Sequence, residues 1–353
     1  MKYAIFDHMD GAGTPLHQQY EDRLNFISLC DRLGFYCYHL AEHHGTPLGF
    51  APSPGIFLAS AAQRSKRMRL GPLLFVLPIY HPVRAYEEIC MLDQLSGGRL
   101  ELGLGRGSMP YEIAMYGEDP ATTQARYLEN FEIIRQAFTQ DEVSFTGKHI
   151  TIKRFPVRIH PLQRPHPPLW YATTKPDSAD WAAETGANIM MLGLIDNARN
   201  VAQRYRAAWT RLGRDPGALP NIGITRHVVV ADTDAEAVAI GRRAYRPWRD
   251  AMEMLWKEAG TPFPIGHVYP DTFDELLKLG NGAAGSPQTV REILDAQAKH
   301  AGLNYFACQI YFGDMTRDEA SHSASLFAEH VIGAHKTEQP EKLRGDLEAT
   351  SSR

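Results

Sequence analysis

The chain has 353 residues, 44% of them hydrophobic, and a formal net charge of −4. This hydrophobic content is enough for a substantial core and suits two domains or one large barrel with insertions. The chain has no block rich in Lys and Arg, so we do not expect nucleic acid as a partner, because phosphate binding needs a positive surface. Neither a signal peptide nor an apolar run of about eighteen residues is present, so no membrane association is predicted.

The four cysteines lie far apart and form no C-x-x-C pair; they are Cys30, Cys37, Cys90 and Cys308. This spacing is typical of reduced, buried thiols rather than of a disulfide framework or a zinc site. We therefore expect a cytoplasmic protein without a metal site.

Short β-branched or aromatic runs alternate with longer helical stretches along the whole chain. In the first half we expect strands at 2–7, 35–41, 69–77 and 100–104, and helices at 20–33, 56–64, 82–95 and 123–140. In the second half we expect strands at 169–172, 189–192, 222–230 and 305–311, and helices at 177–184, 201–212 and 286–300. About eight strand–helix units are what a closed parallel barrel requires, whereas a doubly wound open sheet usually stops at five or six strands. The prediction is therefore an α/β protein with a single (β/α)₈ TIM barrel over residues 1–335.

Two segments interrupt this alternation. Residues 143–162 are predicted to form an added hairpin that turns at Gly147-Lys148. Residues 244–285 are rich in aromatic residues, Pro and Gly, and we expect a long insertion there. Its first part suits a lid that keeps water off a reactive intermediate, or else a surface used in dimer contact. The polar tail 336–353 is expected to be mobile.

The stretch from His81 to Gly107, HPVRAYEEICMLDQLSGGRLELGLGRG, contains the most specific pattern. It predicts a helix, then a buried strand, then the loop Gly105-Arg106-Gly107. Glycines on both sides of Arg106 present an exposed guanidinium, which suits a phosphate. The tripeptide taken alone favours a plain tight turn with a solvated arginine.

The whole stretch resembles the bacterial-luciferase-like flavin monooxygenases, which carry H-P-V-R, L-D-Q-x-S, G-R and G-x-x-R-G at this spacing. Ala41-Glu42-His43-His44 is similar to the family's E-H-H motif, and Asp180-Trp181-Ala182-Ala183 with Gly186 is similar to its W-A-A-x-x-G helix. The resemblance runs from Met1 to about Gly333. It is specific for the family and says little about the substrate.

The resemblance also implies the roles of residues at the flavin phosphate. Arg106 would hold the phosphate from one side, and from the other side it would be held by Thr173, Thr174, Lys175 and Ser178. A helix that begins near Asp177 would add its N–H groups, although Ser178 also suits an ordinary N-cap. Family members often have an acidic residue near Thr174, and the luciferase subunit has Cys in place of Gly105. We therefore expect phosphate contacts to shift to Lys175.

In the family, the first histidine of E-H-H lies beside the reactive edge of the flavin, which assigns the acid or base role to His43. Adjacent strand residues point to opposite faces, so Glu42 and His44 share one face and could form an orienting hydrogen bond. The same geometry keeps two adjacent imidazoles from chelating one metal ion. Without the resemblance, the pair suits one core histidine and one surface histidine.

The third strand passes beneath the flavin in the family, often with a bulge or a non-prolyl cis peptide bond. This assigns Leu73 and Leu74 to the cofactor site, although their sequence alone suggests plain core. Phe6 and Asp7, at the end of the first strand, would be neighbours of the ring.

The resemblance thus implies a monooxygenase that binds reduced FMN, supplied by a separate flavin reductase. It would use O₂, by way of a C4a-peroxyflavin, to oxygenate a small organic substrate. Two alternatives stay open. One is a deazaflavin-dependent oxidoreductase on the same barrel, and the other is a non-catalytic flavin-binding protein, which the retained motifs argue against. A homodimer is also expected, because the helix at 82–95 carries the apolar residues Tyr86, Ile89, Met91 and Leu92.

Overall fold

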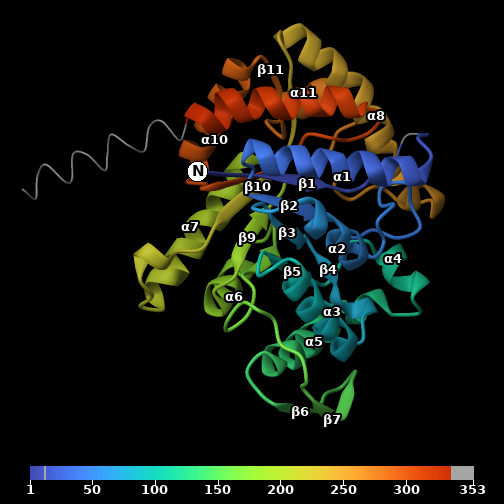
Figure 1. Ribbon diagram of the computed structural model, residues 1–353, viewed down its shortest axis with the longest axis vertical. Coiled ribbons are helices and arrows are strands. Elements are labelled where there is room, and N and C mark those ends of the chain that lie inside the picture. Colours follow the sequence, from blue (N-terminus) through green and yellow to red (C-terminus); the bar gives the residue numbers. More distant parts are fainter. Residues whose placement is uncertain (12, 335–353) are drawn as a thin grey trace, which may run out of the picture.

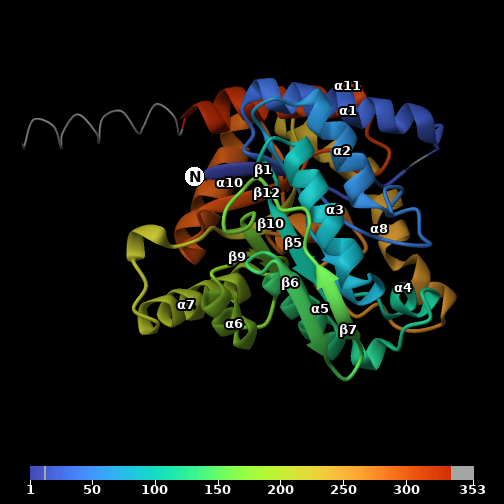
Figure 2. The same cartoon turned by 60° about the horizontal axis from the view of Figure 1, so that its bottom comes forward.

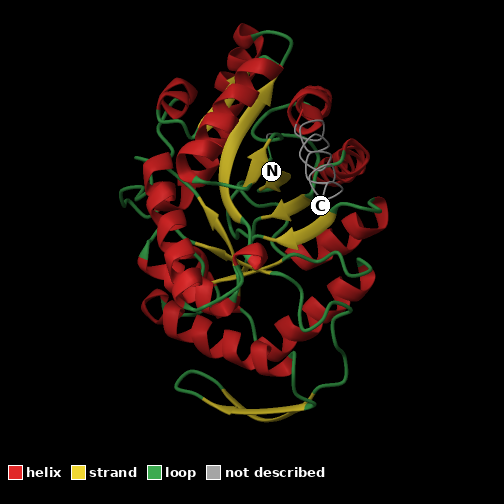
Figure 3. Ribbon diagram, turned by 90° about the vertical axis from the view of Figure 1, so that its left-hand side faces the viewer, coloured by secondary structure: helices red, strands yellow, loops and turns green. Residues whose placement is uncertain are grey.

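The computed structural model describes residues 1–11 and 13–334, so the expected tail 336–353 lies outside the described residues. Its main sheet is a parallel barrel surrounded by helices (Figures 1 and 3). The neighbouring strands follow the order β3-β2-β1-β12-β10-β9-β8-β5-β4, and β11 pairs with β10. These strands are β1 (Lys2–Asp7), β2 (Cys37–Leu40), β3 (Arg69–Pro72), β4 (Phe75–Val76), β5 (Leu102–Gly105), β8 (Leu169–Ala172), β9 (Asn188–Met191), β10 (Ile222–Val230), β11 (Gly282–Gly285) and β12 (Tyr305–Gln309).

The barrel is completed by a short contact between the two ends of this order. Leu70 N donates to Arg99 O at 3.0 Å, and Glu101 N donates to Leu70 O at 2.8 Å. These bonds join β3 to the chain that enters β5. The predicted (β/α)₈ architecture is confirmed, and all its strands run in the same direction.

Helices follow most of the strands and form the outer layer (Figure 1). They are α1 (Leu16–Leu33), α2 (Pro54–Arg64), α3 (Pro82–Leu95), α4 (Pro110–Met115), α5 (Thr123–Ala137), α6 (Asp177–Thr185), α7 (Ile195–Arg211), α8 (Asp234–Glu258), α9 (Phe273–Lys278), α10 (Pro287–Ala301) and α11 (Arg317–Phe327). Local signals explain several boundaries. A proline occupies the first position of α3, where its missing N–H costs nothing. Gly186 ends α6 in the left-handed conformation, with φ at 70°.

The two predicted interruptions differ in outcome. The hairpin is present as β6 (Glu142–Thr146) and β7 (Thr151–Pro156), which pair antiparallel and lie outside the helix layer (Figures 2 and 3). The segment 244–285 is not one irregular insertion, because it contains the second half of α8, then α9 and β11. Pro247 lies inside α8, so the sequence did not indicate that this helix continues. The Gly-Ala-Ala-Gly sequence of β11 has no β-branched residue, so the sequence did not indicate a strand there.

The helix expected to supply a dimer surface is largely used inside the chain itself. Tyr86, Ile89 and Leu92 on α3 are buried in the core, and only Met91 of the four residues is exposed, at 58%. The prediction that these residues supply a dimer surface is therefore wrong for Tyr86, Ile89 and Leu92. A barrel helix needs that apolar face to pack against its own strands and neighbouring helices.

Side chains fill the barrel interior at the N-terminal ends of the strands. Glu101, which is 1% exposed, accepts hydrogen bonds from Trp170 Nε1 at 2.5 Å and Tyr36 OH at 3.0 Å, and it forms an ion pair with Arg69. His39 Nε2 lies 2.7 Å from Tyr305 OH in the same region. Because these side chains fill the barrel at the N-terminal ends of its strands, a site can form only at the rim where the strands have their C-terminal ends, as is usual for this architecture.

Replacing Glu101 by Ala should destabilise the protein by about 3 kcal/mol, because it leaves the Arg69 charge, the buried Trp170 N–H and the half-buried Tyr36 hydroxyl without their acceptor. Urea denaturation followed by circular dichroism measures this change in unfolding free energy. Glu142→Ala is the matched control, since its ion pair with Arg154 is exposed and should contribute less than about 0.5 kcal/mol. Equal effects of the two substitutions would contradict this account of the barrel interior.

Candidate functional site

The predicted site residues follow strands that end at one rim of the barrel. Phe6 belongs to β1, and Glu42, His43 and His44 come after β2. Phe6 pairs with His39 in register, so the end of β1 lies beside the end of β2. The remaining predicted residues lie between β3 and β4, after β5 and after β8; they are Leu73, Leu74, Arg106, Thr173, Thr174, Lys175 and Ser178. Because parallel strands place their C-terminal ends together, the structure brings all of them to the same edge.

His43 is held by a carboxylate that sequence reasoning missed. Its Nδ1 lies 2.9 Å from Glu112 Oε1, and the same oxygen accepts the backbone N–H of His44 at 3.1 Å. Glu112 lies on α4 and is 3% exposed, while the side chain of His43 is 12% exposed. A carboxylate oxygen accepts hydrogen bonds, so the imidazole proton lies on Nδ1. Nε2 of His43 makes no hydrogen bond with the residues that the structure describes, and in the neutral imidazole this nitrogen carries the lone pair.

His44 belongs to a second carboxylate–histidine pair, formed with Glu42. Its Nε2 lies 2.9 Å from Glu42 Oε1, which is the hydrogen bond expected from the sequence. Tyr116 OH donates to His44 Nδ1 at 2.9 Å, and Val76 N donates to Glu42 Oε2 at 3.0 Å. Burial raises the pKa of Glu42 above its usual value. The Glu42–His44 pair thus ties the end of β2 to β4.

A third histidine, His8, directly follows β1 and was also missed by sequence reasoning. Its ring stacks on the ring of His43, with centroids 5.4 Å apart and an interplanar angle of 26°. Trp248 Nε1 from α8 and Gln309 Nε2 from β12 both approach His8 Nδ1, at 3.4 and 3.1 Å. Burial lowers the pKa of His8 well below its usual value, so the ring stays neutral.

The proposed phosphate side of the rim carries a free cation. Arg106 is exposed and makes no hydrogen bond or ion pair with any residue of 1–11 or 13–334. Gly107 adopts φ of 77°, a conformation that favours glycine. Gly103 on β5 pairs with Trp170 on β8, so the chain after β5 runs beside the chain after β8.

The segment after β8 forms a tight turn into α6. Lys175 N donates to Thr173 Oγ1 at 3.0 Å, and Thr174 and Lys175 are exposed. Pro176 is the N-cap of α6, so Ser178 lies inside the first turn and does not cap it. Asp177 adds negative charge to this turn, but Arg204 pairs with it. The N–H groups of a helix start and the Arg106 guanidinium are suitable donors for one phosphate.

The surface between the histidines after β1 and β2 and the proposed phosphate side suits a flat apolar group. Phe6 and Leu74 are only half-buried, and Ala172 is exposed although it lies in β8. A Cβ added at Gly105 would lie 2.5 Å from the Leu74 side chain, so the missing side chain makes room for Leu74 at the rim. The peptide bond between Leu73 and Leu74 is cis, as the resemblance implied. These residues fit an isoalloxazine ring with a single phosphate.

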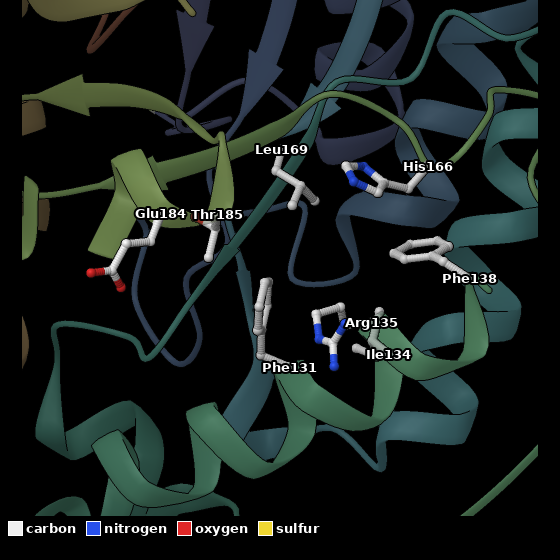
Figure 4. Close-up of a pocket in the computed structure, with 8 residues that line it drawn as sticks. All are labelled: Phe131, Ile134, Arg135, Phe138, His166, Leu169, Glu184 and Thr185. Atoms are coloured by element: carbon white, nitrogen blue, oxygen red, sulfur yellow. The ribbon is translucent and has the colours of Figure 1, made fainter. Parts of the chain in front are cut away.

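A separate cavity of about 250 Å³ lies on the outer surface, between α5 and α6 (Figure 4). Its walls include Phe131 and Phe138 from α5, Thr185 at the end of α6 and Leu169 at the start of β8. Leu169 is at the opposite end of β8 from Thr173. The cavity contains none of the predicted residues, so we do not assign the flavin site to it.

Residues 1–11 and 13–334 contain no group of three or more His, Cys, Asp or Glu side chains that could hold a metal ion. None of the helices described is long and apolar enough to cross a membrane.

The sequence profile of the luciferase-like monooxygenases matches residues 1–304. Among the relatives, the uncharacterized protein y4wF of Sinorhizobium fredii is 41% identical over 94% of this chain and 96% of its own. The oxygenase component of the flavin-dependent trigonelline monooxygenase of Acinetobacter baylyi is 28% identical over 67% of both chains. The crystal structure of monooxygenase RslO1 from Streptomyces bottropensis has a TM-score of 0.84 and 28% identity, and covers 95% of this chain and 100% of that one. Two F420-dependent enzymes have TM-scores of 0.69 and 0.73 at 17% identity, which shows the fold alone. The chain therefore belongs to the luciferase-like monooxygenase family and is an oxidoreductase built on that family's barrel.

Proposed function

We propose that this chain is the oxygenase component of a two-component system. It takes reduced FMN from a separate flavin reductase and uses O₂ to oxygenate a small organic substrate. The observation that carries this proposal is His43, held by the buried Glu112 carboxylate at the rim where Arg106 is free. The relative from Acinetobacter baylyi, itself named as an oxygenase component, supports a separate reductase.

Reduced FMN, when bound, supplies the electrons that activate O₂. Arg106 and the N–H groups at the start of α6 bind its phosphate, and Thr173, Thr174, Lys175 and Ser178 surround that phosphate. Phe6 with the Leu73–Leu74 segment packs against the ring. The assignment to one phosphate follows from the single cation at the end of β5 and the single helix start beside it.

His43 moves the proton that the reaction requires. Its Nδ1 proton is committed to Glu112, so Nε2 is the atom that accepts or donates a proton at the substrate side. Glu42 and His44 do not take part directly. They hold the chain after β2 so that His43 keeps its orientation. The buried ring of Trp248, beside His8, excludes water from this side.

FMN should bind more tightly than FAD, because the site offers donors for one phosphate rather than for a pyrophosphate, and F420 is compared as the deazaflavin alternative. Arg106→Ala should weaken FMN binding by about 1.5–3 kcal/mol, the range for a lost charged hydrogen bond. Calorimetry with the three oxidised cofactors measures this. Arg154→Ala, an exposed arginine on the hairpin, is the matched control and should leave the dissociation constant unchanged. Tighter binding of F420 than of FMN would favour the deazaflavin alternative and contradict the proposal.

His43→Ala should lower oxygenation by about 10²–10⁴-fold, the usual contribution of a positioned proton-transfer group. FMN binding should stay nearly unchanged, and hydrogen peroxide should replace the lost product, since O₂ still consumes the reduced flavin. His44→Ala should lower stability more than coupling, because His44 bonds Tyr116 and also Glu42, the residue that links the chain after β2 to β4. The measurements are product yield and peroxide release with a substrate found by screening. Full coupling in His43→Ala would eliminate histidine as the proton donor.

We also propose a homodimer that pairs through the exposed apolar residues of α2 and α3, which are Ile56, Met91 and Leu95. These three exposed apolar side chains lie on two helices that pack beside each other, which suits an interface. Met91→Glu should then convert the dimer to a monomer in light scattering at micromolar concentration. A monomer mass for the unaltered protein would contradict this proposal.

A further inference from the structure

The surroundings of His8 determine which of its ring nitrogens carries the proton. An indole N–H can only donate, and the amide nitrogen of Gln309 also donates. Both lie at Nδ1 of His8, so Nδ1 accepts and the proton lies on Nε2. The neutral tautomer is therefore fixed by two donors from different elements, α8 and β12. Nε2–H faces away from both of them.

The Nε2–H group of His8 has no acceptor in the described part of the chain. Some polar side-chain atoms, such as His227 Nε2, are inaccessible to solvent and have no hydrogen-bond partner. His8 Nε2 is not one of these inaccessible atoms. His8 as a whole is 4% exposed. This N–H has no hydrogen-bond acceptor among the described residues and is still accessible, although the rest of the ring is buried at the rim. It is therefore available to a ligand.

His8 and His43 together present two complementary groups on neighbouring strand ends. In its neutral form His43 offers a lone pair at Nε2, because its Nδ1–H donates to the Glu112 carboxylate. His8 offers an N–H donor from a ring stacked against it, 5.4 Å away between centroids. Phe6 lies edge-on to His8 at 4.8 Å and adds an apolar wall. A hydrogen-bond donor beside a base suits a substrate in which an oxygen acceptor lies close to the atom that gains or loses a proton.

In the described part of the chain, the ring and hydrogen-bond neighbours of His8 include no Asp, Glu, Lys or Arg side chain that could pair with an ionised ligand. Its neighbours are Phe6, His43, Trp248 and Gln309. His227, which also acts on His8, is kept neutral because burial lowers its pKa to about 3. Burying a carboxylate or an ammonium here without a partner would cost several kcal/mol.

We propose that His8 binds an oxygen atom of the organic substrate through Nε2–H, and that the site selects uncharged substrates carrying a carbonyl or hydroxyl group. The proposal rests on the proposed function, since it assigns the substrate class to the same rim. It makes His8 a specificity-determining residue beside the base His43.

The test uses the FMN-loaded protein and three matched ring probes: cyclohexanone, cyclohexanecarboxylate and cyclohexylammonium. Binding is measured by saturation-transfer NMR at millimolar probe concentrations, without turnover. Cyclohexanone should bind at least about tenfold more tightly than either charged probe, because neither charge finds a partner. His8→Phe keeps the stacked ring and loses the N–H, so it should weaken cyclohexanone binding by about three- to tenfold, the loss expected for one neutral hydrogen bond.

Two further variants separate the hydrogen bond from a packing effect. His8→Gln places an amide N–H near the position of Nε2 and should restore part of the cyclohexanone affinity. His322→Phe, on the exposed side of α11, is the matched control and should change nothing. The FMN dissociation constant should stay constant in all three variants. Nitrogen-15 NMR should find His8 neutral, with its proton on Nε2, between about pH 5 and 8.

The outcomes distinguish this inference from the function on which it rests. A protein that does not bind FMN would overturn the proposed function and the inference together. Normal FMN binding with no cyclohexanone binding, with equal binding of a charged probe, or with unchanged cyclohexanone affinity in His8→Phe, would overturn the inference alone. A proton on Nδ1 of His8 would also overturn it.

Discussion

The hydrogen bonds of Leu70 with Arg99 and Glu101 close the ring of parallel strands, and the site depends on that closure. A closed parallel barrel places every C-terminal strand end at one rim, whatever the separation of those ends along the chain. The same closure creates the interior in which Glu101 accepts hydrogen bonds from Trp170 and Tyr36. That packed lower half leaves open only the rim where the chemistry-bearing residues lie.

Glu112 connects two parts of this rim that the chain keeps apart. It lies on α4, which follows the loop of Arg106, and it accepts hydrogen bonds from both His43 and the backbone of His44. The proposed phosphate side and the proposed proton-transfer side are therefore joined through one short helix. A single carboxylate oxygen fixes the tautomer of His43 and the path of the chain after β2. This contact occupies Nδ1 of His43 and leaves Nε2 as the nitrogen that can serve a ligand.

The local sequence pattern was enough to predict much of the fold. It did not predict the residues whose place in the site depends on tertiary contacts. The ranges of β1, β8, β10 and α3 were predicted without error, since apolar periodicity and an N-terminal proline mark them. The hydrogen bond between Glu42 and His44 was expected from the sequence, although β2 ends at Leu40 and these residues lie beyond the strand. By contrast, Glu112 and His8 have no local signal, because their partners lie 69 and 240 or more positions away in the chain. The apolar face of α3 was assigned to a dimer because the sequence does not reveal which faces its own barrel covers.

The central claim is that FMN binds across this rim, with its phosphate beside Arg106 and its ring beside His43. A crystal structure of the protein with FMN tests it most directly. The account predicts a phosphate within hydrogen-bond distance of the Arg106 guanidinium and of backbone N–H groups at the start of α6. It also predicts a ring in contact with Phe6 and Leu74, with His43 Nε2 facing its reactive edge. FMN bound in the cavity between α5 and α6, or at the rim with His43 turned away from the ring, would contradict the account.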